Sequence, residues 1–153
     1  SLIFKKIIKE LGFSYAFGQH SGVIDSTKDL FELPRFPINE KYGEIKRFNL
    51  ILNSLPFKYK NIFPEEKFLQ DQNNPPEVSI EFFEKIKNLE HITCYSNEEN
   101  KWRKSDIKFI ESNKLQINLE GKFTTERGRI NCSLRDNSGG WRWLGMQFVI
   151  ANK

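Results

Sequence analysis

The sequence of 153 residues contains few cysteines and histidines and no long hydrophobic run. Its apolar runs stay far below the roughly 20 residues that a membrane-spanning helix requires, and no basic flank followed by an apolar block marks a signal peptide. The cysteines, Cys94 and Cys132, and the histidines, His20 and His91, cannot form a structural zinc site without several further ligands. The sequence therefore predicts neither a membrane span nor a metal site within this chain.

Basic residues are not gathered in one part of the chain, although the net charge is +4. Residues 1–72 carry 11 Lys and Arg against 9 Asp and Glu, and residues 73–153 carry 13 against 11. The densest basic group, Lys5, Lys6 and Lys9, is most simply the solvated face of a helix. We therefore expect no nucleic acid among the partners.

The first third of the chain reads as helix, strand, loop and helix. Apolar residues at helical spacing predict a helix over Leu2–Leu11, which Gly12 ends, and a short buried strand over Phe13–Phe17. Asn39 is positioned to cap a second helix that Pro56 ends. These elements are too few for a complete α/β domain. Because the first residue is also not Met, we expect the chain to begin inside a domain.

The pattern changes after residues 56–76, which have the composition of a linker. Beyond them, apolar residues alternate with polar ones in six short segments, as strands with one buried face do. The six segments are 78–82, 92–94, 107–109, 115–119, 130–134 and 144–150. Asn137–Gly140 reads as the turn of a closing hairpin. We therefore predict a small antiparallel β-sandwich over residues 73–153.

The two cysteines both point inward in this register. They are 38 residues apart in the sequence, and a disulfide between Cys94 and Cys132 would restrict the unfolded chain by about 3 to 4 kcal/mol on the entropy model. Two unlinked core thiols satisfy the same pattern. The sequence leaves the two states open.

The loop from Tyr15 to Ile38 is rich in Gly, Pro and polar residues, as the rim of a site is. His20 follows a predicted strand, where α/β sheets place groups that contact ligands, although a loop residue without a chemical role fits equally well. A hydrolase built on His20 and Ser21 is disfavoured, because neighbours in sequence rarely present their side chains to each other.

Arg35 stands between Pro34 and Pro37, which restrict the backbone around it and help to hold the guanidinium in place. It is therefore a candidate to line a pocket. A buried ion pair explains it equally well. The acidic residues available for such a pair are Asp25, Asp29 and Glu32.

Trp141 and Trp143 share one face of the last predicted strand, opposite the apolar face that includes Leu144 and Met146. Their rings could stack on sugars and bind a substrate. They could also pack against the first segment, which is the commoner arrangement because folded proteins cover an apolar patch of two indoles.

Several motifs in order resemble the C-terminal part of bacterial polysaccharide deacetylases of the NodB-homology class. The matching stretches are AFGQHSGVI, LPRFPINEKYG, NSLPF, ITCY, INCSL and GGWRWLGMQFVI. The resemblance implies an α+β protein: the C-terminal fragment of a distorted (β/α) barrel in residues 1–72, with a linker, followed by an accessory antiparallel, Ig-like β-sandwich in residues 73–153. It also implies that His20, Ser21 and Arg35 line the pocket.

In that family a divalent metal, usually zinc, is held by an Asp and two His and activates water for amide hydrolysis. The Asp-Asp pair and the His-x-x-x-His motif that supply these ligands are not in this sequence. The resemblance thus implies a portion of an enzyme that removes N-acetyl or O-acetyl groups from an envelope or extracellular polysaccharide, without activity or a cofactor of its own. Its expected partners are the missing N-terminal part of the domain and, through it, the polysaccharide. The alternative is a non-catalytic module that binds carbohydrate or braces a neighbouring domain.

Overall fold

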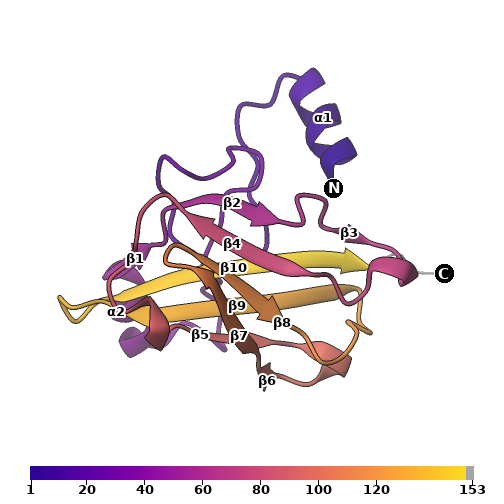
Figure 1. Cartoon of the computed structure of the whole chain (residues 1–153). Coiled ribbons are helices and arrows are strands. Elements are labelled where there is room, and N and C mark those ends of the chain that lie inside the picture. Colours follow the sequence, from indigo (N-terminus) through magenta and orange to yellow (C-terminus); the bar gives the residue numbers. More distant parts are fainter. Residues whose placement is uncertain (151–153) are drawn as a thin grey trace.

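Two β-sheets packed face to face form most of the molecule (Figure 1). The structure, a computed structural model, describes residues 1–150, so the last three residues of the expected sandwich lie outside the described part. Two helices, α1 (Leu2–Glu10) and α2 (Ile45–Leu52), belong to the N-terminal segment, residues 1–53. The predicted β-sandwich is confirmed, in a protein that is mostly β.

The six-stranded sheet has the order β1-β10-β9-β5-β6, with β3 paired to the far end of β10. Its strands are β1 (Ser54–Pro56), β3 (Phe68–Leu69), β5 (Thr93–Ser96), β6 (Arg103–Lys104), β9 (Arg127–Arg135) and β10 (Trp141–Ile150). The four-stranded sheet has the order β2 (Tyr59–Phe63), β4 (Val78–Phe82), β8 (Lys114–Asn118) and β7 (Asp106–Glu111). Short 3-10 helices, η1 (Asp71–Asn73), η2 (Leu89–His91) and η3 (Glu98–Asn100), lie in the connections.

All six predicted strands are present, and in β4, β5, β8, β9 and β10 alternate residues are buried between the sheets. On β10, Leu144, Met146 and Phe148 point into the core, as the alternation predicts. The hairpin between β9 and β10 closes where the Asp136 N–H donates to the Gly140 carbonyl at 2.8 Å. Full burial of a large apolar side chain contributes about 1.5 to 3 kcal/mol to the free energy of unfolding.

Cys94 and Cys132 form a disulfide within this core. They lie directly opposite each other on the neighbouring strands β5 and β9. The bond therefore links two strands of one sheet, unlike the inter-sheet disulfide of immunoglobulin domains.

The sandwich begins earlier in the chain than the sequence predicts. Residues 54–69 form β1, β2 and β3, whereas the expected linker spans 56–76. In β2 the period of two is hidden, because an irregularity between Tyr59 and Asn61 shifts the register with β4. β1 and β3 pair with β10 in parallel, so the six-stranded sheet is mixed rather than purely antiparallel.

The first helix forms as expected. The Phe4 N–H donates to the Ser1 hydroxyl at 3.3 Å, and Gly12 follows the helix with a φ of +84°, the left-handed conformation that glycine adopts without strain. Asn39, in contrast, does not cap α2, because its side chain accepts from the Tyr42 N–H at 3.1 Å and closes a separate turn. The second helix starts only at Ile45.

The predicted strand over Phe13–Phe17 is wrong. Only Phe17 pairs, in an isolated bridge with Leu33, because this part of the loop bonds to itself. The Ala16 N–H donates to the Leu30 carbonyl, and the Leu33 N–H donates to the Ala16 carbonyl, both at 2.9 Å. Within residues 1–53 no fragment of a (β/α) barrel is evident. None of the helices in residues 1–150 is both long and apolar enough to cross a membrane.

Candidate functional site: a cleft between the N-terminal loop and the sheet

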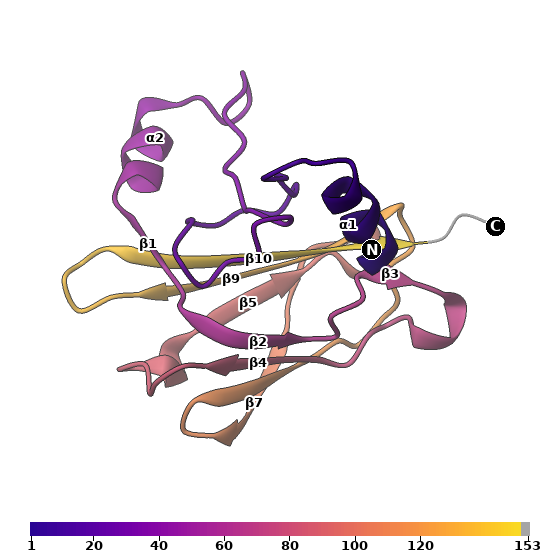
Figure 2. The same ribbon diagram turned by 90° about the horizontal axis from the view of Figure 1, so that it is seen from above.

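The N-terminal segment covers the outer face of the six-stranded sheet. Figure 2 shows α1, α2 and their connecting loop on one side of β9 and β10, with β2, β4 and β7 on the other. Gly22 forms an isolated bridge with Leu144 of β10. At Gly145 the approach is so close that a Cβ atom would lie 2.4 Å from the Ser21 carbonyl oxygen. Glycine is therefore required at this position to seat the loop.

A buried lysine anchors the loop to the sandwich. The Lys28 ammonium donates to the Phe57 carbonyl at 2.7 Å and to the Asp25 carboxylate at 2.9 Å, and it lies 4.4 Å from the centre of the Tyr59 ring. Burial lowers the pKa of Lys28, although Asp25 partly opposes this change. Burial also opposes ionisation of Asp25, but hydrogen bonds from Thr27 and Lys28 outweigh it and lower the pKa of Asp25.

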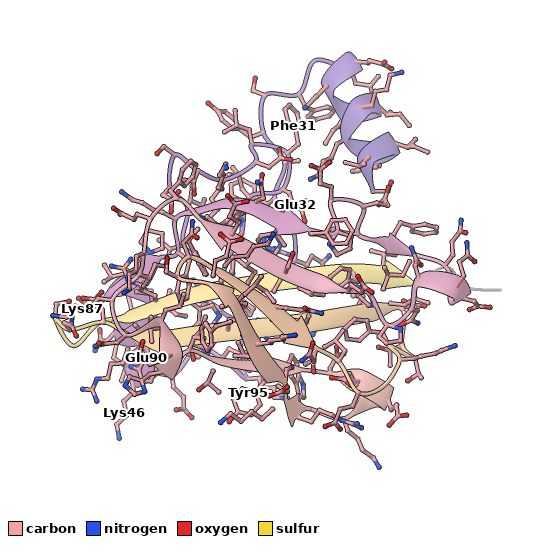
Figure 3. The ribbon with its side chains drawn as sticks, in the orientation of Figure 1. Phe31, Glu32, Lys46, Lys87, Glu90 and Tyr95 are labelled. Atoms are coloured by element: carbon pink, nitrogen blue, oxygen red, sulfur yellow. A yellow bond between two sulfur atoms is a disulfide. The ribbon has the colours of Figure 1, made fainter. Side chains whose placement is uncertain are left out.

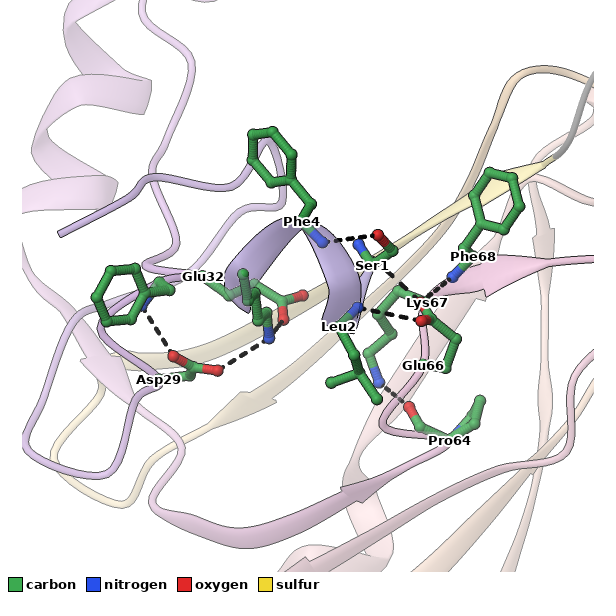
Figure 4. A network of polar contacts seen from close by, with 11 residues as sticks. Ser1, Leu2, Phe4, Asp29, Glu32, Pro64, Glu66, Lys67 and Phe68 are labelled. Atoms are coloured by element: carbon green, nitrogen blue, oxygen red, sulfur yellow. Dashed lines mark hydrogen bonds and ion pairs between the residues drawn. The ribbon is translucent and has the colours of Figure 1, made fainter. Parts of the chain in front are cut away.

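Ionic contacts hold α1 against the loop and the sandwich (Figure 4). Lys5 pairs with Asp29 at 2.9 Å and also with Glu32, while the Leu2 N–H donates to the Glu66 carboxylate at 3.1 Å. Figure 3 shows Glu32 on the loop between α1 and the sheets. Burial lowers the pKa of Lys5, but the hydrogen bonds to Glu32 and Asp29 outweigh it and raise the pKa above its usual value.

A cleft of about 770 Å³ lies between the loop and the sheet, and we call it the arginine cleft. Its N-terminal wall includes His20, Ser21, Arg35, Phe36, Tyr42 and Arg47. The facing wall includes Trp102, which follows η3, and Arg129, Asn131 and Trp143 of the sheet. The fold thus brings four predicted site residues, His20, Ser21, Arg35 and Trp143, into one lining.

His20 sits where the arginine cleft meets a second cleft of about 440 Å³, whose lining includes Lys5, Glu32 and Lys67. Burial lowers the pKa of His20, so its imidazole is uncharged at neutral pH. The His20 carbonyl accepts from the Arg35 N–H at 3.0 Å. In the described chain no hydrogen bond joins the His20 and Ser21 side chains, so a hydrolytic pair is not formed.

Arg35 is exposed and is not held by an ion pair. Its Nε donates to the Gly18 carbonyl at 3.1 Å. The acidic residues that the sequence offered pair with lysines instead, Asp25 with Lys28, and Asp29 and Glu32 with Lys5. The expected alternative of a buried ion pair at Arg35 is therefore wrong.

The two tryptophans of β10 differ in their surroundings. Trp143 packs edge-to-face against Phe36, with ring centres 5.9 Å apart, so it contacts the N-terminal segment. Trp141 is 36% exposed and does not belong to the lining of the arginine cleft. The two indoles thus do not act together at this cleft.

Sequence reasoning missed several residues of the arginine cleft. Arg129 and Asn131 flank the buried Ile130 on β9, so the alternation that selected Trp143 could also have placed them on the outer face. Arg47 and Trp102 come from distant segments, and no pattern in the sequence connects them to the loop. The Arg47 guanidinium lies 5.0 Å from the centre of the Tyr42 ring.

Residues 1–150 contain no group of three or more His, Cys, Asp or Glu placed to hold a metal ion. His91 lies in η2, beside Glu90 at 3.9 Å, and does not line the arginine cleft. The arrangement around His20 offers arginine, amide and aromatic groups, which suit binding rather than metal coordination.

No known family model matches the chain, and none of the curated proteins matches it either. Among solved structures, the fold is similar to that of PcoC, a copper resistance protein from Escherichia coli, with a TM-score of 0.42 and 9% sequence identity. The matched region covers 61% of this chain and 99% of PcoC. At this identity and score, the similarity carries no inference about function.

Proposed function

We propose that this chain is a non-catalytic β-sandwich module that braces the last segment of a polysaccharide deacetylase. The observation that supports it most is the fit of the loop on β10. The Ser21 backbone lies so close to Gly145 that a residue with a side chain would collide with it. Lys28 adds a buried polar contact to the Phe57 carbonyl, and Lys5 adds an ion pair with Asp29. These contacts hold residues 1–53 against the sandwich.

The residues of this chain do not fit the zinc site that the resemblance implies. That site needs an Asp and two His together, and His20 and His91 lie in different regions without a shared carboxylate. In this proposal the metal ligands, the acid and the base come from another part of the deacetylase.

The apolar surface of the N-terminal segment supports a neighbouring domain. Ile3, Phe4 and Leu11 around α1 and Ile45 and Leu52 of α2 are all at least 60% exposed. Isolated soluble domains rarely leave so many large apolar side chains in water. A catalytic domain that packs on these two helices would cover them.

The bracing role is tested by Gly145→Ala, whose methyl group would collide with the Ser21 backbone. We expect faster hydrogen exchange across residues 15–38, with little change in the amides of β4 and β9. Gly140→Ala is the matched control, because a methyl group there meets nothing closer than 3.4 Å. Unchanged exchange in Gly145→Ala would contradict the brace.

Catalytic dependence on another part of the protein is tested separately. We expect this chain, with added Zn²⁺, to release no acetate from acetylated chito-oligosaccharides, and a longer product of the same reading frame that includes upstream residues to release it. Acetate release by the 153-residue chain alone would overturn the proposal, as would an inactive longer protein without the Asp-Asp pair and His-x-x-x-His motif.

A further inference from the structure

The arginine cleft has a strongly one-sided charge. Arg35, Arg47 and Arg129 line it, and its lining contains no Asp or Glu. Within residues 1–150, the arginines that form ion pairs are Arg103 and Arg142, which lie elsewhere. Three guanidinium groups without a carboxylate partner attract an anion, and their forked geometry suits carboxylates and phosphates.

The same cleft contains buried donors without an acceptor. Arg47 Nε, Arg129 Nε and the Trp143 indole Nε1 are buried and have no hydrogen-bond partner in the described chain. A buried donor left unsatisfied costs about 1 to 3 kcal/mol, so native proteins usually provide a partner. All of the unsatisfied buried side-chain atoms in this lining are donors, which indicates a ligand rich in acceptor oxygens.

Aromatic rings complete the lining. Tyr42, Trp102 and Trp143 contribute aromatic rings to the lining, and Asn131 adds an amide that can donate and accept. Amphipathic rings beside a few polar groups suit ligands with both apolar faces and hydroxyl groups. At about 770 Å³ the cleft also matches a multi-ring ligand rather than a single small ion.

We propose that the arginine cleft binds a carboxylate-bearing polysaccharide segment. Arg35, Arg47 and Arg129 hold its carboxylates, and Trp143 and Trp102 contact its sugar rings. The inference rests on the proposed bracing function, because one wall of the cleft is the braced loop and the other is the sheet. It extends that function by assigning an acidic polymer to the protein.

The test is calorimetric titration of the full chain with two matched probes. A hyaluronan tetrasaccharide alternates N-acetylglucosamine with glucuronate, whereas chitotetraose has the same acetylated sugar without carboxylates. We expect saturable binding of the first and at least tenfold weaker binding of the second. We also expect the affinity to fall with added salt, because ionic contacts are screened.

Arg129→Met should weaken hyaluronan binding at least tenfold, and Arg47→Met provides a second, independent variant. Arg135→Met is the matched control, because Arg135 is on the same strand and outer face but outside the cleft lining. Equal binding of the two probes, equal loss in Arg135→Met, or no binding by the unmodified chain would overturn the proposal. Full displacement of the saccharide by equimolar inorganic phosphate would reduce the site to a simple anion site and also overturn it.

The two proposals can fail separately. In Arg129→Met, hydrogen exchange across residues 15–38 should stay unchanged while binding is lost, since the buried Arg129 Nε has no hydrogen-bond partner. In Gly145→Ala, both the protection of the loop and the binding should be lost. Binding that survives in Gly145→Ala would show that the cleft does not need the seated loop.

Discussion

The sandwich and the N-terminal segment are stabilised in different ways. In residues 54–150, side chains such as Phe57, Phe82 and Phe148 are fully buried in one shared core. In residues 1–53, the buried apolar side chains are those of Ile8, Leu33 and Pro34, and α2 has no buried residue. The sandwich is therefore stabilised by its own core, while the segment depends on the surface to which it is attached.

This difference follows from the kind of contact that stabilises each region. The sandwich buries the apolar faces of two sheets against each other, and the many buried side chains each contribute a small amount to the free energy of unfolding. The segment is held by a few ionic and backbone contacts centred on Lys5, Lys28 and Gly145. Regions with few buried apolar contacts open at lower free energy than the core does. We expect the segment to open before the sandwich unfolds.

The largest test compares a core phenylalanine with an exposed one. Phe148 is fully buried and stacks on Phe123, with ring centres 5.7 Å apart, so Phe148→Ala should cost about 3 to 5 kcal/mol of unfolding free energy. Phe4 is 60% exposed, and Phe4→Ala should change stability by no more than about 0.5 kcal/mol. Urea unfolding followed by far-UV circular dichroism measures both. Similar losses in the two variants would remove the distinction between the regions.

The next effect concerns the disulfide. Cys94→Ala combined with Cys132→Ala should lower the unfolding free energy by about 3 to 4 kcal/mol, because the bond closes a loop of 38 residues in the unfolded chain. The loss of stability should lie in the sandwich. Hydrogen-exchange protection of residues 15–38 should fall no more than that of the sandwich. Intact mass after alkylation, with and without reductant, checks that the bond is present. An identical mass in both conditions would contradict the pairing.

A smaller effect is expected where the two regions meet. Lys28→Met keeps the length of the side chain but removes the ammonium that donates to the Phe57 carbonyl and to Asp25 Oδ2. We expect a loss of about 1 to 3 kcal/mol in the attachment of the loop, seen as faster hydrogen exchange in residues 15–38. Lys60→Met is the control, since Lys60 forms an exposed pair with Glu81. Equal exchange in the two variants would mean that Lys28 does not anchor the loop.

The smallest effect depends on pH. Burial beneath the N-terminal segment lowers the pKa of Lys67 to about 8, from about 10.5 in an exposed chain. Between these pH values the unfolded chain binds more protons at this site than the folded chain, so the contribution of Lys67 to stability rises with pH. The stability of Lys67→Met relative to the unmodified chain should therefore be greatest below pH 8 and should fall as the pH rises to about 10.5, because only the unmodified chain gains stability over this range.

The titration of Lys67 also tests whether the two regions stay together. NMR detection of its Nζ signals should give the lowered pKa in the unmodified chain. In Gly145→Ala, where the loop is displaced, the pKa should return toward 10.5. A pKa near 10.5 in the unmodified chain would show that the segment does not cover this lysine.

The parts that could be predicted from the sequence are those that local patterns encode. The six alternating strands and the helix that Gly12 ends were all recognisable, because burial of one face imposes a period on the residues. The same alternation placed Trp143 on the outer face, whereas His20, Ser21 and Arg35 were selected from the composition of their loop. β2 was not predicted because an irregularity interrupts its alternation, and β1 and β3 are too short to show an alternating pattern.

The sequence by itself determined a two-layer β protein with two cysteines that point into the core. It also marked residues 15–38 as a loop rich in Gly, Pro and polar residues. Only the tertiary structure decided that Arg47, Arg129 and Trp102 meet around that loop, and that Gly145 seats it. The physical reason is that periodicity reports which face of an element is buried, but not which distant element lies against the other face. The composition of a cleft depends on that second contact, so it appears only when the chain is folded.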